Sequence, residues 1–148
     1  MTTIVESIEI ARGPEDVFTY ATDFSRFPEW QGGIVSVRAE GDSPPAMGST
    51  AMVTRRVGPR RLSGAQEITE LNPPRSWTAR TVDGPVRGTA SMTIEPLAHG
   101  ERSRVTIALD FEGHGIGKLL VPLVVRRQAR RQLPINEQRL KRVLEQGA

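Results

Sequence analysis

The last third of the chain most constrains what it can fold into. Between Arg104 and Glu112 an apolar residue falls at every second position, the spacing of a half-buried strand: Val105, Ile107, Leu109 and Phe111. A glycine-rich stretch follows at 113–117, and residues Ile116 to Glu145 then read as one long helix. A long helix directly after a strand needs a broad apolar surface to lie on. We therefore expect a curved sheet wrapped around the terminal helix, with space between the two layers.

Two prolines, Pro122 and Pro134, lie inside this helix. Each removes a backbone N–H and crowds the preceding turn, so kinks are expected rather than a straight rod. The segment 126–131 is basic nearly all round. Two apolar stripes flank it and are expected to face the sheet: Ile116, Leu120, Leu123 and Val124 at the start, and Leu133, Leu140 and Leu144 at the end.

The rest of the chain reads as a strand, two short helices and a run of strands. The first strand is expected near residues 4–10. A helix should open at Pro14, where proline loses no hydrogen bond, and a second should run from Asp23 to Phe27, before Pro28. No helix-length segment interrupts the chain between Gly33 and Gly113, so the sheet should be antiparallel. Its further strands are predicted at 34–39, 50–57, 61–71, 77–82, 86–95 and 104–112, with a loop at 41–45.

Length and composition fit one globular domain over residues 1–148. Apolar residues make up 37% and charged residues 25% of the 148, as in soluble proteins. The sequence has no apolar run of membrane-spanning length, no signal peptide and no cysteine. These features predict a cytoplasmic protein without disulfides.

Three local stretches carry a family resemblance. They are residues 13–23, which contain Pro14-Glu15-Asp16-Val17-Phe18; the short helix Phe27-Pro28-Glu29-Trp30; and the strand-end turn Glu70-Leu71-Asn72-Pro73-Pro74-Arg75. In this order they resemble the START-like, or Bet v 1-like, superfamily, often described as polyketide cyclase/dehydrase and lipid transport proteins, and the resemblance covers nearly the whole chain.

The resemblance implies an α+β helix-grip fold. In this fold an antiparallel curved sheet of about seven strands wraps around a long C-terminal helix, with two short helices after the first strand. It also implies an apolar cavity between sheet and helix. Members bind lipids, hormones, polyketides or quinones, and some catalyse cyclisation or dehydration. The shared stretches build the scaffold, so they transfer no catalytic role to this sequence.

Strand alternation suggests which residues would line such a cavity. Small inward residues, such as Gly88 and Ala90 opposite larger ones, would leave volume unfilled, although simple packing against the helix is the favoured explanation for each residue taken alone. The resemblance places Trp30 at the cavity mouth. The residues expected to contact a ligand are Trp30, Met52, Gln66, Trp77, Met92, Leu109, Phe111, Leu120 and Val124.

Tyr20 and His114 are the candidates for proton transfer. The Tyr20 hydroxyl could donate to a ligand carbonyl, and His114 lies where the last strand meets the helix, with a pKa suited to acid–base work. A core role for Tyr20 and an exposed turn position for His114 are the alternatives. No metal-ligand cluster, Ser-His-Asp arrangement, phosphate loop or dinucleotide fingerprint is present, so neither a metal nor a cofactor is expected.

Arginine dominates the basic residues, and it gathers in two places. Arg55-Arg56 and Arg60-Arg61 flank a predicted hairpin turn, and with residues 126–131 they would attract anions. No stacking aromatics lie beside them, which argues against nucleic acid. Transient attraction to an acidic membrane surface would suit the loading of a lipid. A solvated surface of the kind that a high-GC genome encodes explains the same arginines.

Two functions are therefore favoured. The first is the binding, for transport or sequestration, of a hydrophobic small molecule between sheet and helix. The alternative is a polyketide cyclase/dehydratase-type enzyme acting on an aromatic or polyketide-like substrate. An arginine-driven interaction module is a third hypothesis, and it predicts salt-dependent partner binding. The ligand's identity stays open, as does the choice between a monomer and a homodimer.

Overall fold

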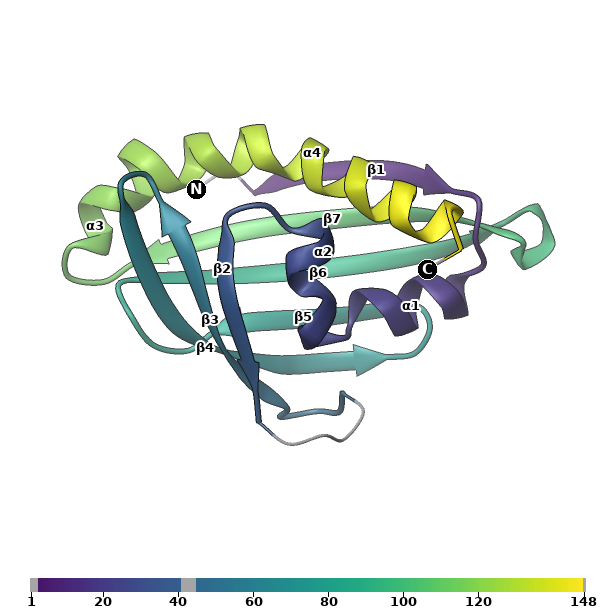
Figure 1. Cartoon of the computed structure of the whole chain (residues 1–148), viewed down its shortest axis with the longest axis horizontal. Helices are drawn as coiled ribbons and strands as arrows, with labels where there is room; N and C mark the ends of the chain where they lie inside the picture. Colours follow the sequence, from purple (N-terminus) through teal and green to yellow (C-terminus); the bar gives the residue numbers. More distant parts are fainter. Residues whose placement is uncertain (1–2, 41–44, 148) are drawn as a thin grey trace.

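The computed structural model describes residues 3–40 and 45–147, so the predicted loop at 41–45 lies almost wholly outside the described residues. Seven strands form one antiparallel sheet in the order β1-β7-β6-β5-β4-β3-β2 (Figure 1). The strands are β1 (Ile4–Ile10), β2 (Ile34–Ala39), β3 (Thr50–Val57), β4 (Arg60–Asn72), β5 (Ser76–Thr81), β6 (Val86–Leu97) and β7 (Arg102–Gly113). The predicted antiparallel sheet of about seven strands is confirmed.

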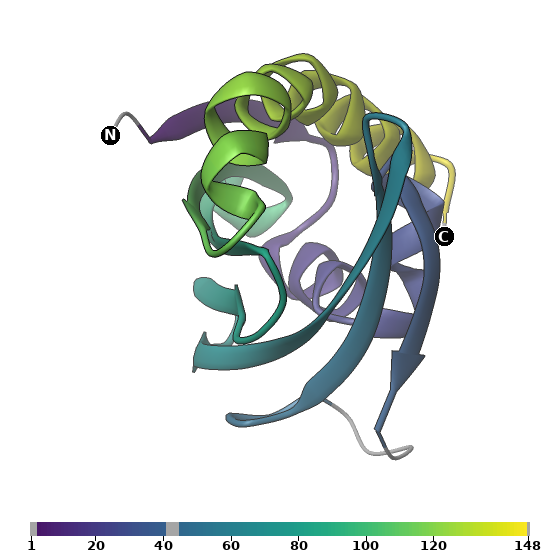
Figure 2. The ribbon, with the colours of Figure 1, turned by 90° about the vertical axis from the view of Figure 1, so that its left-hand side faces the viewer.

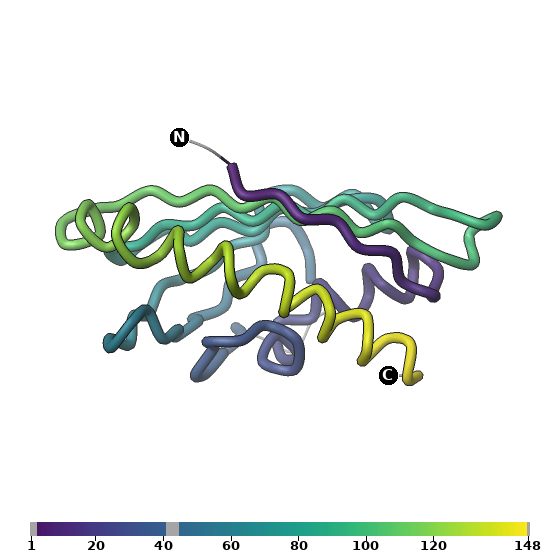
Figure 3. Tube along the Cα trace, turned by 90° about the horizontal axis from the view of Figure 1, so that it is seen from above, coloured from purple at the N-terminus to yellow at the C-terminus, as the bar shows by residue number. Residues whose placement is uncertain are grey.

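The helices lie on one face of this sheet. They are α1 (Pro14–Ala21), the 3₁₀ turn η1 (Phe24–Arg26), α2 (Phe27–Trp30), α3 (Gly117–Leu120), the π-helical η3 (Val121–Val125) and α4 (Arg126–Glu145), while a further 3₁₀ turn, η2 (Ala98–Gly100), lies in the β6–β7 connection. Seen end-on, the sheet curls so that β2–β4 and β1 rise on either side of α4 (Figure 2). From above, α4 crosses the strands obliquely (Figure 3). This arrangement confirms the helix-grip fold.

Pro28 does not end the second short helix as predicted. Asp23 does cap a turn, because its Oδ1 accepts from the Ser25 amide at 3.0 Å, but that turn is the 3₁₀ element η1. Pro28 then occupies the first turn of α2, where its missing N–H has no helical partner to lose. The chain therefore continues to Trp30, and Phe27 and Trp30 are both buried.

The C-terminal helix changes its hydrogen-bond pattern at one of its two prolines. The π-helical turn η3 contains Pro122, as expected for a residue that removes a helical donor, whereas α4 runs through Pro134 without interruption. The predicted stripe at the helix start is corrected: Val121 and Val125 are buried, and Leu123 is 67% exposed. Through the wider π turn the buried positions recur every four residues, at Gly117, Val121 and Val125. Leu123 lies midway between the last two and therefore points to the outside.

Strand alternation holds along the inner face of the sheet. Ala90 on β6 lies between Ala79 on β5 and Leu109 on β7, and Met92 lies between Trp77 and Ile107. Glycine is required where β7 turns into α3, because a Cβ on Gly117 would collide with the Pro85 carbonyl. The chain can therefore turn tightly, and the long helix lies directly over the inner face.

Candidate functional site

A cavity of about 190 Å³ lies between the inner face of the sheet and α4. The strands β3 to β7 supply its floor and sides, and α2 and α4 close it. An apolar cavity of about 150 Å³ is large enough to hold benzene, so this one can take at least one aromatic ring. None of the helices in the described part of the chain is long and apolar enough to cross a membrane.

Six residues predicted from the sequence to contact a ligand line this cavity: Trp30, Gln66, Trp77, Met92, Leu109 and Phe111. Both tryptophans of the chain are among them. Phe27 lies beside both, with its ring centroid 6.0 Å from that of Trp30 and 6.1 Å from that of Trp77. The small residues Gly88 and Ala90 also line the cavity, which provides the volume expected from their size.

Three other predicted residues do not line it. Met52 is 42% exposed on the outer face of β3, because its neighbours Ala51 and Val53 take the inward positions. Leu120 and Val124 pack instead in a small cluster with Val57, at the start of the helix. The assignment of these three residues to the cavity is therefore corrected.

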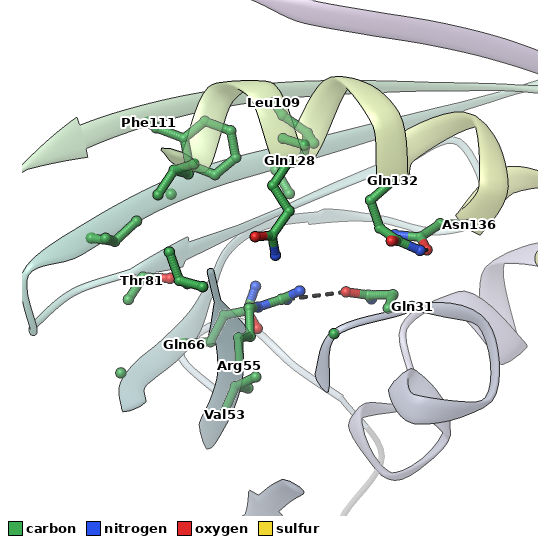
Figure 4. A pocket seen from close by; sticks show the side chains of 18 of the residues that line it. Gln31, Val53, Arg55, Gln66, Thr81, Leu109, Phe111, Gln128, Gln132 and Asn136 are labelled. Atoms are coloured by element: carbon green, nitrogen blue, oxygen red, sulfur yellow. Dashed lines mark hydrogen bonds between the residues drawn. The ribbon is translucent and has the colours of Figure 1, made fainter. Parts of the chain in front are cut away.

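Arg55 lines the cavity, although the sequence pattern suggests a place at a basic hairpin tip. It shares the inward parity of Ala51, Val53 and Val57, all three of which are buried. Figure 4 shows its side chain between β3 and the loop after α2. Its Nη2 donates to Oε1 of Gln31 at 3.0 Å. The alternation of residues 51–57 was the available signal, and the adjacent Arg56, which is exposed, obscured it.

The charge on Arg55 is not neutralised inside the cavity. Among the described residues, none of those that line it is acidic, and the guanidinium makes a single side-chain hydrogen bond, to the neutral Gln31. Burial lowers the pKa of Arg55 to about 10, so the group is still protonated at neutral pH. A guanidinium carries five N–H donors, most of which are left to meet a bound molecule.

A row of amides on α4 closes the cavity opposite Arg55: Gln128, Gln132 and Asn136 (Figure 4). Gln128 binds the backbone of the β3–β4 hairpin twice, since its Nε2 donates to Arg56 O at 2.7 Å and its Oε1 accepts from Gly58 N at 3.1 Å. Asn136 Oδ1 accepts from Gly32 N at 2.9 Å and from Gln132 at 2.9 Å. These bonds fasten α4 to the β3–β4 hairpin and to the loop after α2.

Two polar atoms of the cavity wall lack a hydrogen-bond partner within the described residues. They are Nε1 of Trp30 and Oε1 of Gln66, and both side chains are buried. By contrast, Nε1 of Trp77 donates to Sδ of Met92 at 3.3 Å. An unpaired buried donor and acceptor are costly, so the wall can offer both to a polar ligand atom or to water.

Neither candidate for proton transfer lines the cavity. Tyr20 is buried and donates to Oε1 of Glu29 at 2.7 Å, and burial together with this contact raises its pKa. The side chain of His114 is 40% exposed, with its Nε2 3.3 Å from Glu112 Oε1. In residues 3–40 and 45–147, no three His, Asp or Glu side chains gather as metal ligands. The alternative structural roles considered for Tyr20 and His114 are the ones found.

Comparisons with known proteins agree with this architecture. The family described as "Polyketide cyclase / dehydrase and lipid transport" matches residues 1–145. No curated protein sequence matches the chain. The crystal structure of TTHA0849 from Thermus thermophilus aligns with a TM-score of 0.79 at 18% identity, over 99% of this chain and 100% of that one.

Two further solved structures share the fold. The Zhui aromatase/cyclase from Streptomyces sp. R1128 aligns with a TM-score of 0.73 at 13% identity, over 99% of this chain and 98% of that one. A START superfamily protein from Mycobacterium smegmatis aligns with a TM-score of 0.68 at 14% identity, over 97% and 94% of the two chains. Similarity at these identities extends to the fold and not to the site.

Proposed function

The chain belongs to the polyketide cyclase/dehydrase and lipid transport family, and we propose that it binds a hydrophobic small molecule for transport or sequestration. The ligand would lie between the sheet and α4, against Trp30, Trp77, Met92, Leu109 and Phe111. Small-molecule sites are typically concave and mostly apolar, with a few polar groups that fix orientation. This cavity has that composition.

One observation carries the proposal further: Arg55 lies in this apolar cavity without an acidic partner among the described residues. A partly desolvated guanidinium is best satisfied by an anionic oxygen, as in a carboxylate, phenolate or enolate. The proposed ligand is therefore amphipathic. Its apolar body would fill the cavity, and its oxygen would meet Arg55 beside Gln31.

The second candidate function is a cyclase or dehydratase acting on an aromatic or polyketide-like substrate. Arg55 favours it, because a fixed cation in an apolar site stabilises a developing oxyanion. Such an enzyme also needs a proton acceptor. Among the described residues, no Asp, Glu, His, Lys or Tyr lines the cavity. Binding without chemistry is therefore the function that the site supports better.

The proposal is tested by asking what the purified protein carries. Denaturing mass spectrometry of freshly purified protein should release a small amphipathic molecule, and titration with hydrophobic carboxylates should show saturable binding. Prolonged incubation with the released molecule should return it unchanged; a new mass would favour the enzyme. Absence of both a released molecule and saturable binding would contradict the proposal.

An acidic membrane surface is the proposed place where such a ligand is exchanged, because hydrophobic molecules partition into membranes.

A further inference from the structure

The outward face of the C-terminal helix carries a stripe that nothing in the described structure covers. Residues spaced by four make up this outer stripe, which begins with aliphatic side chains, continues with arginines and ends with an isoleucine: Leu119, Leu123, Arg127, Arg131 and Ile135. Leu119 is 65% exposed, Leu123 67% and Ile135 48%. At 1.5 Å per residue, the stripe is roughly 24 Å long.

The outer stripe lies opposite the buried one. Val121, Val125 and Leu133 belong to a parallel series, also spaced by four and offset by two residues, that packs against the sheet. Two residues correspond to about 200° around a helix, so the two series face in opposite directions. Leu119 and Leu123 therefore play no part in the core, and their exposure needs another explanation.

The surroundings of the outer stripe are strongly basic. Residues 113–136 contain five basic residues and no acidic one. The β3–β4 hairpin is bound to this part of the helix through Gln128, and it brings the exposed Arg60 and Arg61 close by. Residues 50–66, which include the hairpin, also lack acidic residues. The face combines protruding aliphatic side chains with an excess of basic over acidic residues.

This charge decides between the possible occupants. A symmetric dimer through the outer stripe would place Arg127 and Arg131 of two copies against each other, and like charges at an interface are costly. A bilayer that contains anionic lipids needs no shape-matched pocket for Leu119 and Leu123. It also attracts each nearby basic residue by about 1 kcal/mol.

We propose that the outer stripe docks the protein on the surface of a bilayer rich in anionic lipids. Leu119 and Leu123, at the helix start, enter the acyl boundary. Arg127 and Arg131, one and two turns further along, stay at the level of the lipid phosphates.

The docking face adjoins the cavity. A shallow external groove is lined by the residues of the outer stripe from Leu123 onward together with Val124, Gln128 and Gln132. Gln128 and Gln132 also line the internal cavity, so they form the wall between the two. Docking would bring this wall to the lipid surface, where a hydrophobic ligand can enter or leave. That consequence rests on the proposed function; the lipid binding itself does not.

The test is sedimentation of the full chain with vesicles of phosphatidylcholine alone or of equimolar phosphatidylcholine and phosphatidylglycerol, with no cavity ligand added. We expect binding to the anionic vesicles only, weakened by salt. Arg127→Gln with Arg131→Gln should weaken binding by roughly 30-fold, at about 1 kcal/mol for each arginine. Leu119→Gln with Leu123→Gln should weaken it at least as much.

Matched controls separate the outer stripe from charge and hydrophobicity in general. The charge control is Arg139→Gln with Arg142→Gln, which removes the same charge from the other end of α4. The control for hydrophobicity is Val5→Gln, which replaces an apolar residue on β1 that is 53% exposed. Both controls should bind as the unaltered protein does. Equal binding to neutral vesicles, no vesicle binding, or equal loss in the controls would overturn the proposal. So would a dimer in solution that Leu119→Gln with Leu123→Gln converts to a monomer. Carboxylate binding in the cavity would survive any of these results.

Discussion

Arg55 and Gln31 form a charge-assisted hydrogen bond in the cavity wall, with Arg55 Nη2 donating to Gln31 Oε1 at 3.0 Å. The two residues come from different elements, β3 and the end of α2, and the amide holds the guanidinium without neutralising it. A protein normally pairs a buried charge with an opposite one. Here the free charge faces an apolar space, which makes Arg55 the residue most directly tied to what the cavity binds.

Arg55→Gln should remove the preference for anionic ligands. A hydrogen bond to a charged group contributes about 1.5–3 kcal/mol, so affinity for naphthalene-2-carboxylate should fall roughly 10- to 150-fold. Affinity for the neutral carboxamide should change little. Isothermal titration calorimetry measures both. The control is Arg38→Gln, which removes an exposed arginine on β2 that does not line the cavity. An equal fall for acid and amide would show that Arg55 does not select charge.

Ala90→Leu should fill the cavity from its floor. Ala90 lies between Ala79 and Leu109 and lines the cavity, so a larger side chain would occupy the space of the ligand. Ligand affinity should fall at least tenfold, while the unfolding free energy should fall by less than the roughly 1–3 kcal/mol that added methylenes cost in a filled core, because the space is open. Ala108→Leu, on the outer face of β7, is the control. Unchanged affinity in Ala90→Leu would place the ligand elsewhere.

Glu137 should make the fold sensitive to pH. It is 2% exposed on the inner side of α4, its Oε2 lacks a partner within the described residues, and burial together with the charge of Glu6 on β1 raises its pKa to about 8. Folding therefore opposes ionisation. The contribution of Glu137 to the free energy of unfolding should be most favourable below pH 4.5, where the group is protonated in both the folded and the unfolded state. As the pH rises toward 8, the free energy of unfolding should decline by up to about 1.4 kcal/mol per pH unit.

Urea unfolding between pH 5 and pH 8 measures this decline. Glu137→Gln should flatten it and be more stable than the unaltered protein at pH 8. The comparison is Glu145→Gln. Hydrogen bonds from Lys141 and from the Ala11 amide lower the pKa of Glu145, so its contribution is present at neutral pH and lost as the pH falls through the lowered pKa. A Glu137→Gln profile parallel to that of the unaltered protein would refute the assignment.

Gln128→Ala should speed ligand exchange. Gln128 joins α4 to the β3–β4 hairpin by two hydrogen bonds, and each typically contributes about 0.5–1.5 kcal/mol. Their loss should ease separation of the helix from the hairpin and raise the ligand dissociation rate roughly tenfold. Stopped-flow displacement measures that rate. Gln138→Ala, on the exposed side of the same helix, should leave it unchanged. Equal rates in the two variants would exclude Gln128 as a closing contact.

The sequence predicted the fold well because alternation is a local signal. The predicted bounds of β2 and β3 match the structure, and the inward positions of β5, β6 and β7 were correct. The helix start was predicted less well, because a π turn shifts the register of Leu123 and Val124 in a way that an ideal helical period does not show. The position of Arg55 in the cavity was missed for a different reason. The charge of the side chain suggested a surface position, whereas the alternation of residues along β3 placed it on the inner face.

The amide wall could not be read from the sequence at all. Gln128 and Asn136 acquire their roles only when α4 meets the hairpin and the loop after α2, which lie about 70 and 100 residues away in the chain. Such pairs depend on tertiary packing. The same holds for Glu137, whose raised pKa depends on burial and on Glu6 of β1.

The most direct test of the account is an NMR titration that follows the two indole N–H signals, since both tryptophans of the chain line the cavity. Naphthalene-2-carboxylate is added to the ¹⁵N-labelled protein. If the cavity is a ligand site, the signals of Trp30 and Trp77 should both shift and saturate together at one equivalent, and Ala90→Leu should abolish the shifts. Indole signals that stay fixed while ligand binding is detected by other means would contradict the account.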